Sequence, residues 1–344
     1  MFRIFRPLLF VGLALCSISS PPGAYGAELK SVPVLDAKIG GHIHPSICRT
    51  KDGTLVVVYR GTNVLMCSRS TDGGATWSKA DPIATSAKRP DSIRAMTAAF
   101  EVYPGTADVL PDGRILVTWN FIGDDKKKDN YYERALLYSL SSDNGATWSE
   151  QTLIRLADGA HLGAVRHNVL PMPDGRWLLP LRVGPPRLYD PKTGALEVFP
   201  VAAPGMKQYA FKQIARTPKG SLIAMGPVLL RSTDSGKTWT SIENFPAKPE
   251  GDTEEGRYLT VVDDGRLLVS WGVGNDNKGV RYNFSADDGL TWNPEPIVVL
   301  PEVSAIARYY SPRTVQVDAN HVGTVFMNRN GVHFVKVPLD VVAK

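Results

Sequence analysis

Ionisable and aromatic residues gather in six short stretches of this sequence, each about seven to eleven residues ahead of a predicted hairpin turn. Strand starts that only filled a core would be apolar, although exposed strand starts are often polar. Histidine, glutamate and tyrosine transfer protons and arginine binds anions, so converging groups of these types predict a binding or catalytic site. The residues are His42, His44, Glu101, Tyr103, His161, Arg166, His167, Tyr209, Lys212, Glu255, Arg257, Arg308, Tyr309 and Tyr310.

Apolar hairpins must position these residues. An Asp-Gly pair between two apolar runs favours a two-residue type I′ turn. If the strands ahead of such turns surround one channel, their starts share a rim. The turns are Asp52-Gly53, Asp112-Gly113, Asp174-Gly175, Lys219-Gly220, Asp264-Gly265 and a degenerate sixth at Asp318-Ala319-Asn320.

An eight-residue motif, S-x-D-x-G-x-T-W, occurs four times, over 70–77, 141–148, 232–239 and 285–292. Its aspartate can accept hydrogen bonds within a tight turn, its glycine supplies positive φ, and its tryptophan can fill the space between sheets. Helical periodicity is nearly absent. The repeats predict an all-β protein, a six-bladed β-propeller with four strands a blade.

Two blades lack the motif. The third, over about 161–205, carries Pro185-Pro186 and the turn Pro191-Lys192-Thr193-Gly194 instead. The sixth is short, and we expect it to take its outer strand from the N-terminal segment 29–39. That exchange would close the ring and remove exposed strand edges.

The four motifs, on this number of blades, resemble the Asp-boxes (BNR repeats) of the sialidase (neuraminidase) superfamily, over essentially the whole of 27–344. The resemblance implies that the boxes face away from the active site, so their aspartates are structural. It also implies that Tyr310, followed by Ser311, is the nucleophile and that Glu255 is the base that takes its proton. A neutral tyrosine suits a sugar whose carboxylate would repel a carboxylate nucleophile.

The chain departs from the sialidase pattern where the family's arginine triad should bind the substrate carboxylate. The run His42-Ile43-His44-Pro45-Ser46 stands where the family has Arg-Ile-Pro. The loop that holds the general acid in the family is only Gly61-Thr62-Asn63, and Asp91 or Glu101 could replace that acid. The candidates for substrate binding are His42, His44, Arg60, Arg166, His167, Arg257, Arg281 and Arg308.

Three functions remain open. The first is an exo-glycosidase of sialidase type that acts on an anionic, sialic-acid-like sugar. The second is a polysaccharide lyase for uronate-containing glycans, because a rim of His, Tyr and Arg suits proton abstraction next to a carboxylate. The third is a glycan-binding propeller without catalysis. We expect a glycan partner and no cofactor, and His42, His44 and His167 lack a carboxylate to complete a metal site.

Residues 1–26 have the pattern of a signal peptide: Arg3 and Arg6, an apolar run, then Ala24-Tyr25-Gly26. Export to the periplasm or medium is the expectation, with lipidation at Cys16 disfavoured by Leu15. Cleavage of this peptide would remove two arginines and no acidic residue, so the net charge would fall from +5 to +3. No basic run indicates nucleic-acid binding, and no later apolar run is long enough to span a membrane.

Cys48 and Cys67 would remain after that cleavage. A strand is predicted between them, so their backbones should lie about 10 Å apart, beyond disulfide reach. We therefore expect two unpaired thiols.

Overall fold

The structure, a computed structural model, describes residues 29–37, 44–61, 63–85, 100–125, 130–158, 162–182, 184–199, 201, 211–226, 228–242, 245, 257–272, 280–300, 312–328 and 331–342. The predicted signal peptide lies outside these residues. Among the described residues, no helix has the length and apolar character needed to cross a membrane.

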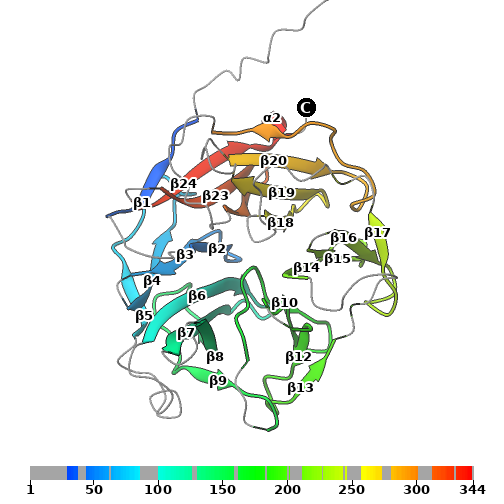
Figure 1. The fold of residues 1–344 in the computed structure, drawn as a ribbon. Coiled ribbons are helices and arrows are strands. Elements are labelled where there is room, and N and C mark those ends of the chain that lie inside the picture. The colour runs from blue at the N-terminus through cyan, green and yellow to red at the C-terminus, as the bar shows by residue number, and fades with distance from the viewer. Residues whose placement is uncertain are drawn as a thin grey trace, which may run out of the picture.

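Six four-stranded antiparallel sheets surround a central channel (Figure 1). This is the six-bladed β-propeller that the repeats predict. From the channel outward, the first three blades are β2 (Ser46–Arg49), β3 (Leu55–Arg60), β4 (Val64–Ser70) and β5 (Asp81–Thr85); β6 (Phe100–Val109), β7 (Ile115–Asp125), β8 (Asn130–Ser141) and β9 (Thr152–Ile154); and β10 (Leu170–Pro171), β11 (Trp177–Leu179), β12 (Arg187–Tyr189) and β13 (Leu196–Val198).

Blades four to six follow in the same order. They are β14 (Gln213–Arg216), β15 (Leu222–Met225), β16 (Leu229–Ser232) and β17 (Thr240–Ile242); β18 (Arg257–Val261), β19 (Leu267–Gly272), β20 (Val280–Ser285) and β21 (Ile297–Val298); and β22 (Arg313–Asp318), β23 (His321–Asn328), β24 (Gly331–Pro338) and β1 (Val32–Asp36). A single helical turn, α2 (Leu339–Val342), follows β24.

The N-terminal strand closes the ring, as the sequence predicts. β1 pairs with β24 in antiparallel register, with Val32 opposite Phe334 (Figure 1, the blue strand beside the red one). The sixth blade therefore takes its outer strand from the other end of the chain. This pairing covers the edge that β24 would otherwise expose.

The hairpin turns differ from the predicted type I′ geometry. Gly53 has a φ of +89°, and its N–H donates to the Thr50 carbonyl at 3.0 Å. Asp52 keeps an ordinary negative φ because its carboxylate accepts a hydrogen bond from the Thr54 N–H at 3.1 Å. Only the glycine needs positive φ, so the turn is type I with a following glycine in the left-handed region. The prediction of two-residue type I′ turns is wrong.

The four S-x-D-x-G-x-T-W motifs form one repeated hydrogen-bonded turn. In the first, Ser70 Oγ donates to Asp72 at 2.8 Å and accepts from the Gly74 N–H at 2.8 Å. Asp72 also accepts from the Thr76 N–H at 2.9 Å and the Thr76 hydroxyl at 2.5 Å. These donors, those of Thr76 above all, lower the pKa of Asp72 to about 2. The motif aspartates are turn-forming groups, as expected.

The motifs lie at the same end of the ring as the hairpin turns. Asn144, in the second motif, donates its amide to Asp52 of the blade-one turn at 2.6 Å. The ammonium of Lys51 in that turn donates to the Pro111 carbonyl at 2.8 Å. The inner strands therefore begin at the opposite end of the ring, which we call the mouth of the channel.

Apolar cores fill the spaces between neighbouring blades. Trp239 of blade four is 4% exposed and belongs to one core with Leu188 and Phe199 of blade three. Its indole N–H donates to the Gly236 carbonyl at 3.1 Å. The expected role of a motif tryptophan as a plug between sheets is confirmed at this position. Trp148 packs against its core but is only half-buried.

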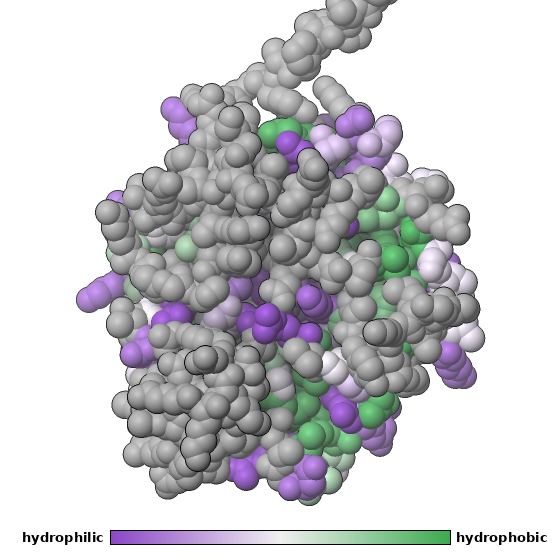
Figure 2. Space-filling view, in the orientation of Figure 1, coloured by the Kyte–Doolittle hydropathy of each residue, from purple (hydrophilic) through white to green (hydrophobic). Residues whose placement is uncertain are grey.

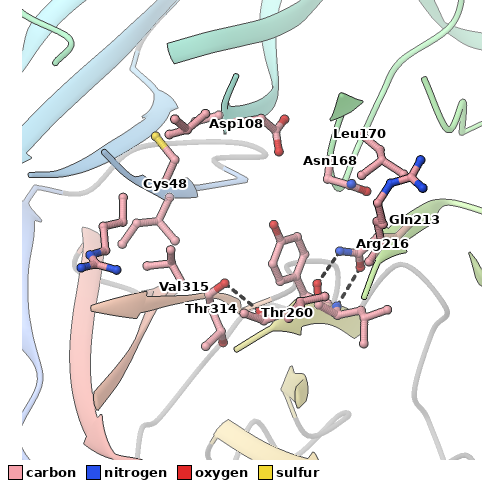
Figure 3. Close-up of a pocket in the computed structure, with 17 residues that line it drawn as sticks. Cys48, Asp108, Asn168, Leu170, Gln213, Arg216, Thr260, Thr314 and Val315 are labelled. Carbon is pink, nitrogen blue, oxygen red and sulfur yellow. Dashed lines mark hydrogen bonds between the residues drawn. The ribbon is translucent and has the colours of Figure 1, made fainter. Parts of the chain in front are cut away.

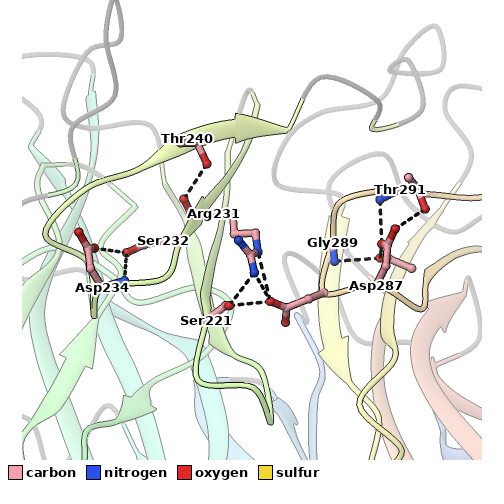
Figure 4. Close-up of polar contacts among 10 residues, drawn as sticks. Ser221, Arg231, Ser232, Asp234, Thr240, Asp287, Gly289 and Thr291 are labelled. Atoms are coloured by element: carbon pink, nitrogen blue, oxygen red, sulfur yellow. Dashed lines mark hydrogen bonds and ion pairs between the residues drawn. The ribbon is translucent and has the colours of Figure 1, made fainter.

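A part-buried ion pair also joins blades four and five (Figure 4). Asp288, in the fourth motif, is 4% exposed and accepts from Arg231 Nη2 at 2.6 Å and Nε at 3.1 Å. The Ser221 hydroxyl donates to the same carboxylate oxygen at 2.5 Å. The fourth motif thus contacts its neighbouring blade through both a core and a charge pair.

Both remaining cysteines are free and buried, as the sequence predicts. Cys48 lies opposite Val56, and Cys67 lies opposite Val58, so β3 stands between them. Burial raises the pKa of both thiols, that of Cys67 to about 11. The two thiols are therefore protonated and unreactive at neutral pH.

Candidate functional site

The channel mouth is lined by the starts of the inner strands and by the residues just before them. Strongly hydrophilic side chains gather at the centre of this face (Figure 2). Of the polar stretches, the structure describes His44, Tyr103, Arg166, His167, Lys212 and Arg257. It joins His44, Tyr103 and Arg166 by direct contacts, and Arg166 and Lys212 lie close enough to His167 to lower its pKa.

His44 and Tyr103 form a hydrogen-bonded pair across blades one and two. The Tyr103 hydroxyl is bonded to His44 Nε2, and the two ring centroids lie 4.8 Å apart. His44 has a φ of +39° although Pro45 follows it. A non-glycine residue in this region costs about 1 to 3 kcal/mol and is commonest at functional sites. The fold thus holds His44 in a strained conformation that places its ring against Tyr103.

Arg166 of blade three completes this group from the other side. Its guanidinium carbon lies 3.9 Å from the centroid of the Tyr103 ring, a close cation–π contact. A bulge in β6 after Pro104 brings the strand close to blade three. A Cβ on Gly105 would meet the Val165 carbonyl oxygen at 2.9 Å, so only glycine fits there. One local irregularity of β6 therefore brings Tyr103 and Arg166 together.

Asn120 is a site candidate that the sequence did not reveal. It is the direct cross-strand partner of Tyr103 and is completely buried. Neither atom of its amide has a hydrogen-bond partner among the described residues. An unsatisfied buried amide costs about 1 to 3 kcal/mol, which a bound hydroxyl or carboxylate would offset. The sequence pattern does not mark Asn120 as a site residue, because it lies within an apolar run that predicts a strand.

Arg313, the first residue of β22, is a second candidate that the sequence did not reveal. It is 3% exposed, and its Nη1 donates to the His167 carbonyl at 2.6 Å and to Ser46 Oγ at 3.3 Å. Its guanidinium lies 5.3 Å from the centroid of the Tyr258 ring. Burial lowers the pKa of Arg313 to about 10, so it remains charged at neutral pH. It lies nearer to its hairpin turn than the polar stretches of the sequence do.

His167 is neutral in this setting. It is 2% exposed, and neither ring nitrogen has a hydrogen-bond partner among the described residues. Burial, followed by the charges of Arg313, Lys212 and Arg166, holds the pKa of His167 well below 6.5. A neutral imidazole among three cations can donate one hydrogen bond and accept another.

Polar side chains join each pair of neighbouring inner strands just inside the mouth. We call Ser46, Asp108, Asn168, Gln213, Thr260 and Arg313 the polar belt. The contacts are Ala107 N to Ser46 Oγ (3.0 Å), Val169 N to Asp108 Oδ2 (2.9 Å), Asn168 Nδ2 to the Ile214 carbonyl (2.9 Å), Gln213 Nε2 to the Leu259 carbonyl (2.6 Å), Thr260 Oγ1 to the Thr314 carbonyl (2.8 Å) and Arg313 Nη1 to Ser46 Oγ (3.3 Å).

A cavity of about 280 Å³ lies within the channel, along the inner strands toward their hairpin turns (Figure 3). Asp108 and Asn168 line it, and Cys48, on the inner strand next to that of Asp108, lines it as well. Burial raises the pKa of Asp108 to about 6, against the hydrogen bonds from Thr106 and Val169 and the charge of Arg313. Four residues of the belt, Asp108, Asn168, Gln213 and Thr260, line this cavity.

Solved structures share this architecture at low sequence identity. A protein of unknown function from Dyadobacter fermentans DSM 18053 matches 90% of this chain and 99% of its own, with a TM-score of 0.61 at 20% identity. The Hadza microbial sialidase Hz136 matches 87% of this chain and 66% of its own, with a TM-score of 0.62 at 16% identity. An α-L-arabinanase from Penicillium chrysogenum, complexed with arabinobiose, matches 92% and 99%, with a TM-score of 0.60 at 13% identity. No protein-family model and no curated protein sequence matches the chain.

The chain folds as a sialidase-like six-bladed β-propeller. Identities of this size establish the fold and leave the chemistry to the residues at the mouth. In this sialidase-like propeller the mouth is built from His44, Tyr103, Arg166, His167 and Arg313.

The other predicted site residues divide into two groups. Arg60 ends β3 and Arg257 begins β18, both buried, while Arg281 lies on the third strand of blade five. Glu101 is on β6, where only its backbone is described. The predicted residues outside the described part of the chain are His42, Asp91, Glu255, Arg308 and Tyr310, with His161, Tyr209 and Tyr309 of the wider rim.

Metal-type ligands do not cluster at the mouth in the part of the chain that the structure describes. No three His, Cys, Asp or Glu side chains there lie close enough to hold an ion. The groups that do converge are arginines, a neutral histidine and a His–Tyr pair. Such a set can bind an acidic group and move a proton beside it.

Proposed function

We propose that the protein is an exported glycoside hydrolase of sialidase type, which binds an acidic sugar at the channel mouth and cleaves its glycosidic bond. The observation that carries this proposal is the gathering of Arg166, His167 and Arg313 at the mouth: Arg166 lies 3.9 Å from the centroid of the Tyr103 ring, and Arg313 Nη1 donates to the His167 carbonyl at 2.6 Å. Arginine binds the carboxylate of an acidic sugar with paired, charge-assisted hydrogen bonds.

In this proposal Tyr310 is the nucleophile, Glu255 takes its proton, and Asp91 or Glu101 protonates the leaving group. The support for these roles is their place in the sequence, ahead of the turns whose strands line the mouth. Export rests on the signal-peptide pattern of residues 1–26. Proteins that act on extracellular glycans need such export.

A panel of fluorogenic glycosides tests the proposal. We expect turnover of sialosides or uronides and little turnover of the matched neutral sugars. Tyr310→Phe keeps the ring and removes the nucleophilic oxygen, so kcat should fall at least about a hundredfold while binding persists. Tyr189→Phe, in the outer part of blade three, is the control and should leave kcat unchanged.

Equal turnover of acidic and neutral sugars would contradict the proposed substrate class. Full activity in Tyr310→Phe would contradict the proposed nucleophile.

A further inference from the structure

His44, Tyr103 and Arg166 form one contact set at the mouth. The Tyr103 hydroxyl is bonded directly to His44 Nε2, and Arg166 lies over the same ring at 3.9 Å. Tyr103 itself is 4% exposed and Arg166 is 7% exposed. A phenol in this position can pass its proton to the imidazole, and the cation over the ring stabilises the negative charge that remains.

The neighbours of this group are suited to holding a carboxylate beside it. Arg313 and Arg166 both act electrostatically on His167, so the two arginines lie near one another at the rim. An arginine that neutralises a carboxylate makes the hydrogen on the adjacent carbon more acidic, because the charge that develops on its removal is stabilised.

We propose that Tyr103 and His44 form a proton-transfer pair that cleaves uronate-containing glycans by β-elimination. The substrate is a polysaccharide or oligosaccharide in which a uronic acid lies on the reducing side of the scissile linkage, with the preceding sugar attached through its C4 oxygen. Arg166 neutralises the uronate carboxylate. Tyr103 is the base, and His44 is its proton acceptor and the acid for the leaving group.

The step balances without an added reactant. Tyr103 gives its hydroxyl proton to His44 Nε2, and the phenolate oxygen takes the C5 proton of the uronate. The C5–H electron pair forms the C4–C5 double bond as the C4–O bond breaks. The departing oxygen takes the proton from His44, which returns both residues to their starting states. No water is consumed, and the product carries an unsaturated uronate.

This activity rests on the proposed function for the acidic-sugar site alone and uses a different bond-breaking step. Hydrolysis adds water and gives saturated sugars. Elimination gives a product that absorbs in the near ultraviolet. The two reactions are therefore told apart by their products, whichever residues carry them.

The experiment incubates the purified full chain with polygalacturonate, alginate and chondroitin, and follows both ultraviolet absorbance and new reducing ends. We expect absorbance to rise in step with reducing ends on at least one polymer. Tyr103→Phe should lower that rate by roughly 10² to 10⁴-fold, with binding of the polymer retained. Tyr138→Phe, on the third strand of the same blade, is the matched control and should keep the wild-type rate.

His44→Gln provides a second variant if Tyr103→Phe does not fold. Glutamine can still accept the Tyr103 hydrogen bond but cannot take up a proton, so the rate of elimination should fall as it does in Tyr103→Phe. Reducing ends without absorbance would overturn the elimination and leave the proposed hydrolase standing. No absorbance on any of the polymers, or full elimination activity in Tyr103→Phe, would also overturn it.

Discussion

At the residue scale, burial sets the protonation of the central groups. Arg313 stays charged and His167 stays neutral. The pKa of Asp108, inside the channel, is raised above the ordinary value for an aspartate. The Thr106 hydroxyl and the Val169 N–H each donate to Asp108, at 2.5 and 2.9 Å. The buried Asp108 near Arg313 therefore lowers the free energy of unfolding when its carboxyl group is ionised.

The raised pKa of Asp108 predicts a pH-dependent loss of stability. The folded state holds its proton up to about pH 6, whereas the unfolded chain releases it near its ordinary pKa of 3.8. The free energy of unfolding should therefore fall as pH rises through this window, by about 2 to 3 kcal/mol. Asp108→Asn removes the titration, so its stability relative to the wild type should increase from pH 4.5 to pH 7 in denaturant unfolding. Parallel curves for the two proteins would show that Asp108 ionises freely.

At the element scale, the motif turns couple hydrogen bonding to packing between blades. The aspartate and serine of each motif form the hydrogen bonds of the turn, and the tryptophan packs toward the core between neighbouring blades. Trp239 does this most completely, since its ring is 4% exposed between blades three and four.

Trp239→Ala should therefore lower the free energy of unfolding by about 3 to 5 kcal/mol. Trp148→Ala is the matched comparison, and its loss should be smaller because that ring is half-buried. Denaturant unfolding of both variants measures the difference. Equal small losses would mean that the motif tryptophan does not pack between blades.

The elements were also the most predictable level from sequence. Repeated Asp-Gly turns and the four motifs predict the blades, and the position of 29–39 predicts the closing strand. The predicted turn type was wrong because the Thr54 N–H donates a local hydrogen bond to the Asp52 carboxylate, and this bond competes with type I′ geometry. Arg313 was missed because its contacts with Ser46 and His167 of other blades, rather than a local sequence pattern, place it at the mouth. Asn120 was missed because it lies within an apolar strand.

At the scale of the whole molecule, the ring has two distinct faces. Turns, motifs and their hydrogen bonds occupy one face, and the starts of the inner strands occupy the other. The polar belt joins all six blades between them, with Gln213 and Leu259 exchanging two hydrogen bonds at 2.6 and 2.7 Å. A belt of this kind fixes the spacing of the inner strands, so the side chains at the mouth are held in place from below.

The most direct test of the acidic-sugar site compares the binding of a uronate or sialate oligosaccharide with that of its carboxyl methyl ester, by isothermal titration. The ester keeps the shape of the sugar and removes its charge. A buried charge-assisted contact contributes about 1.5 to 3 kcal/mol, so the acid should bind at least about tenfold more tightly. Arg166→Met should abolish this preference while leaving the fold intact. Equal affinity for acid and ester in the wild type would contradict the account.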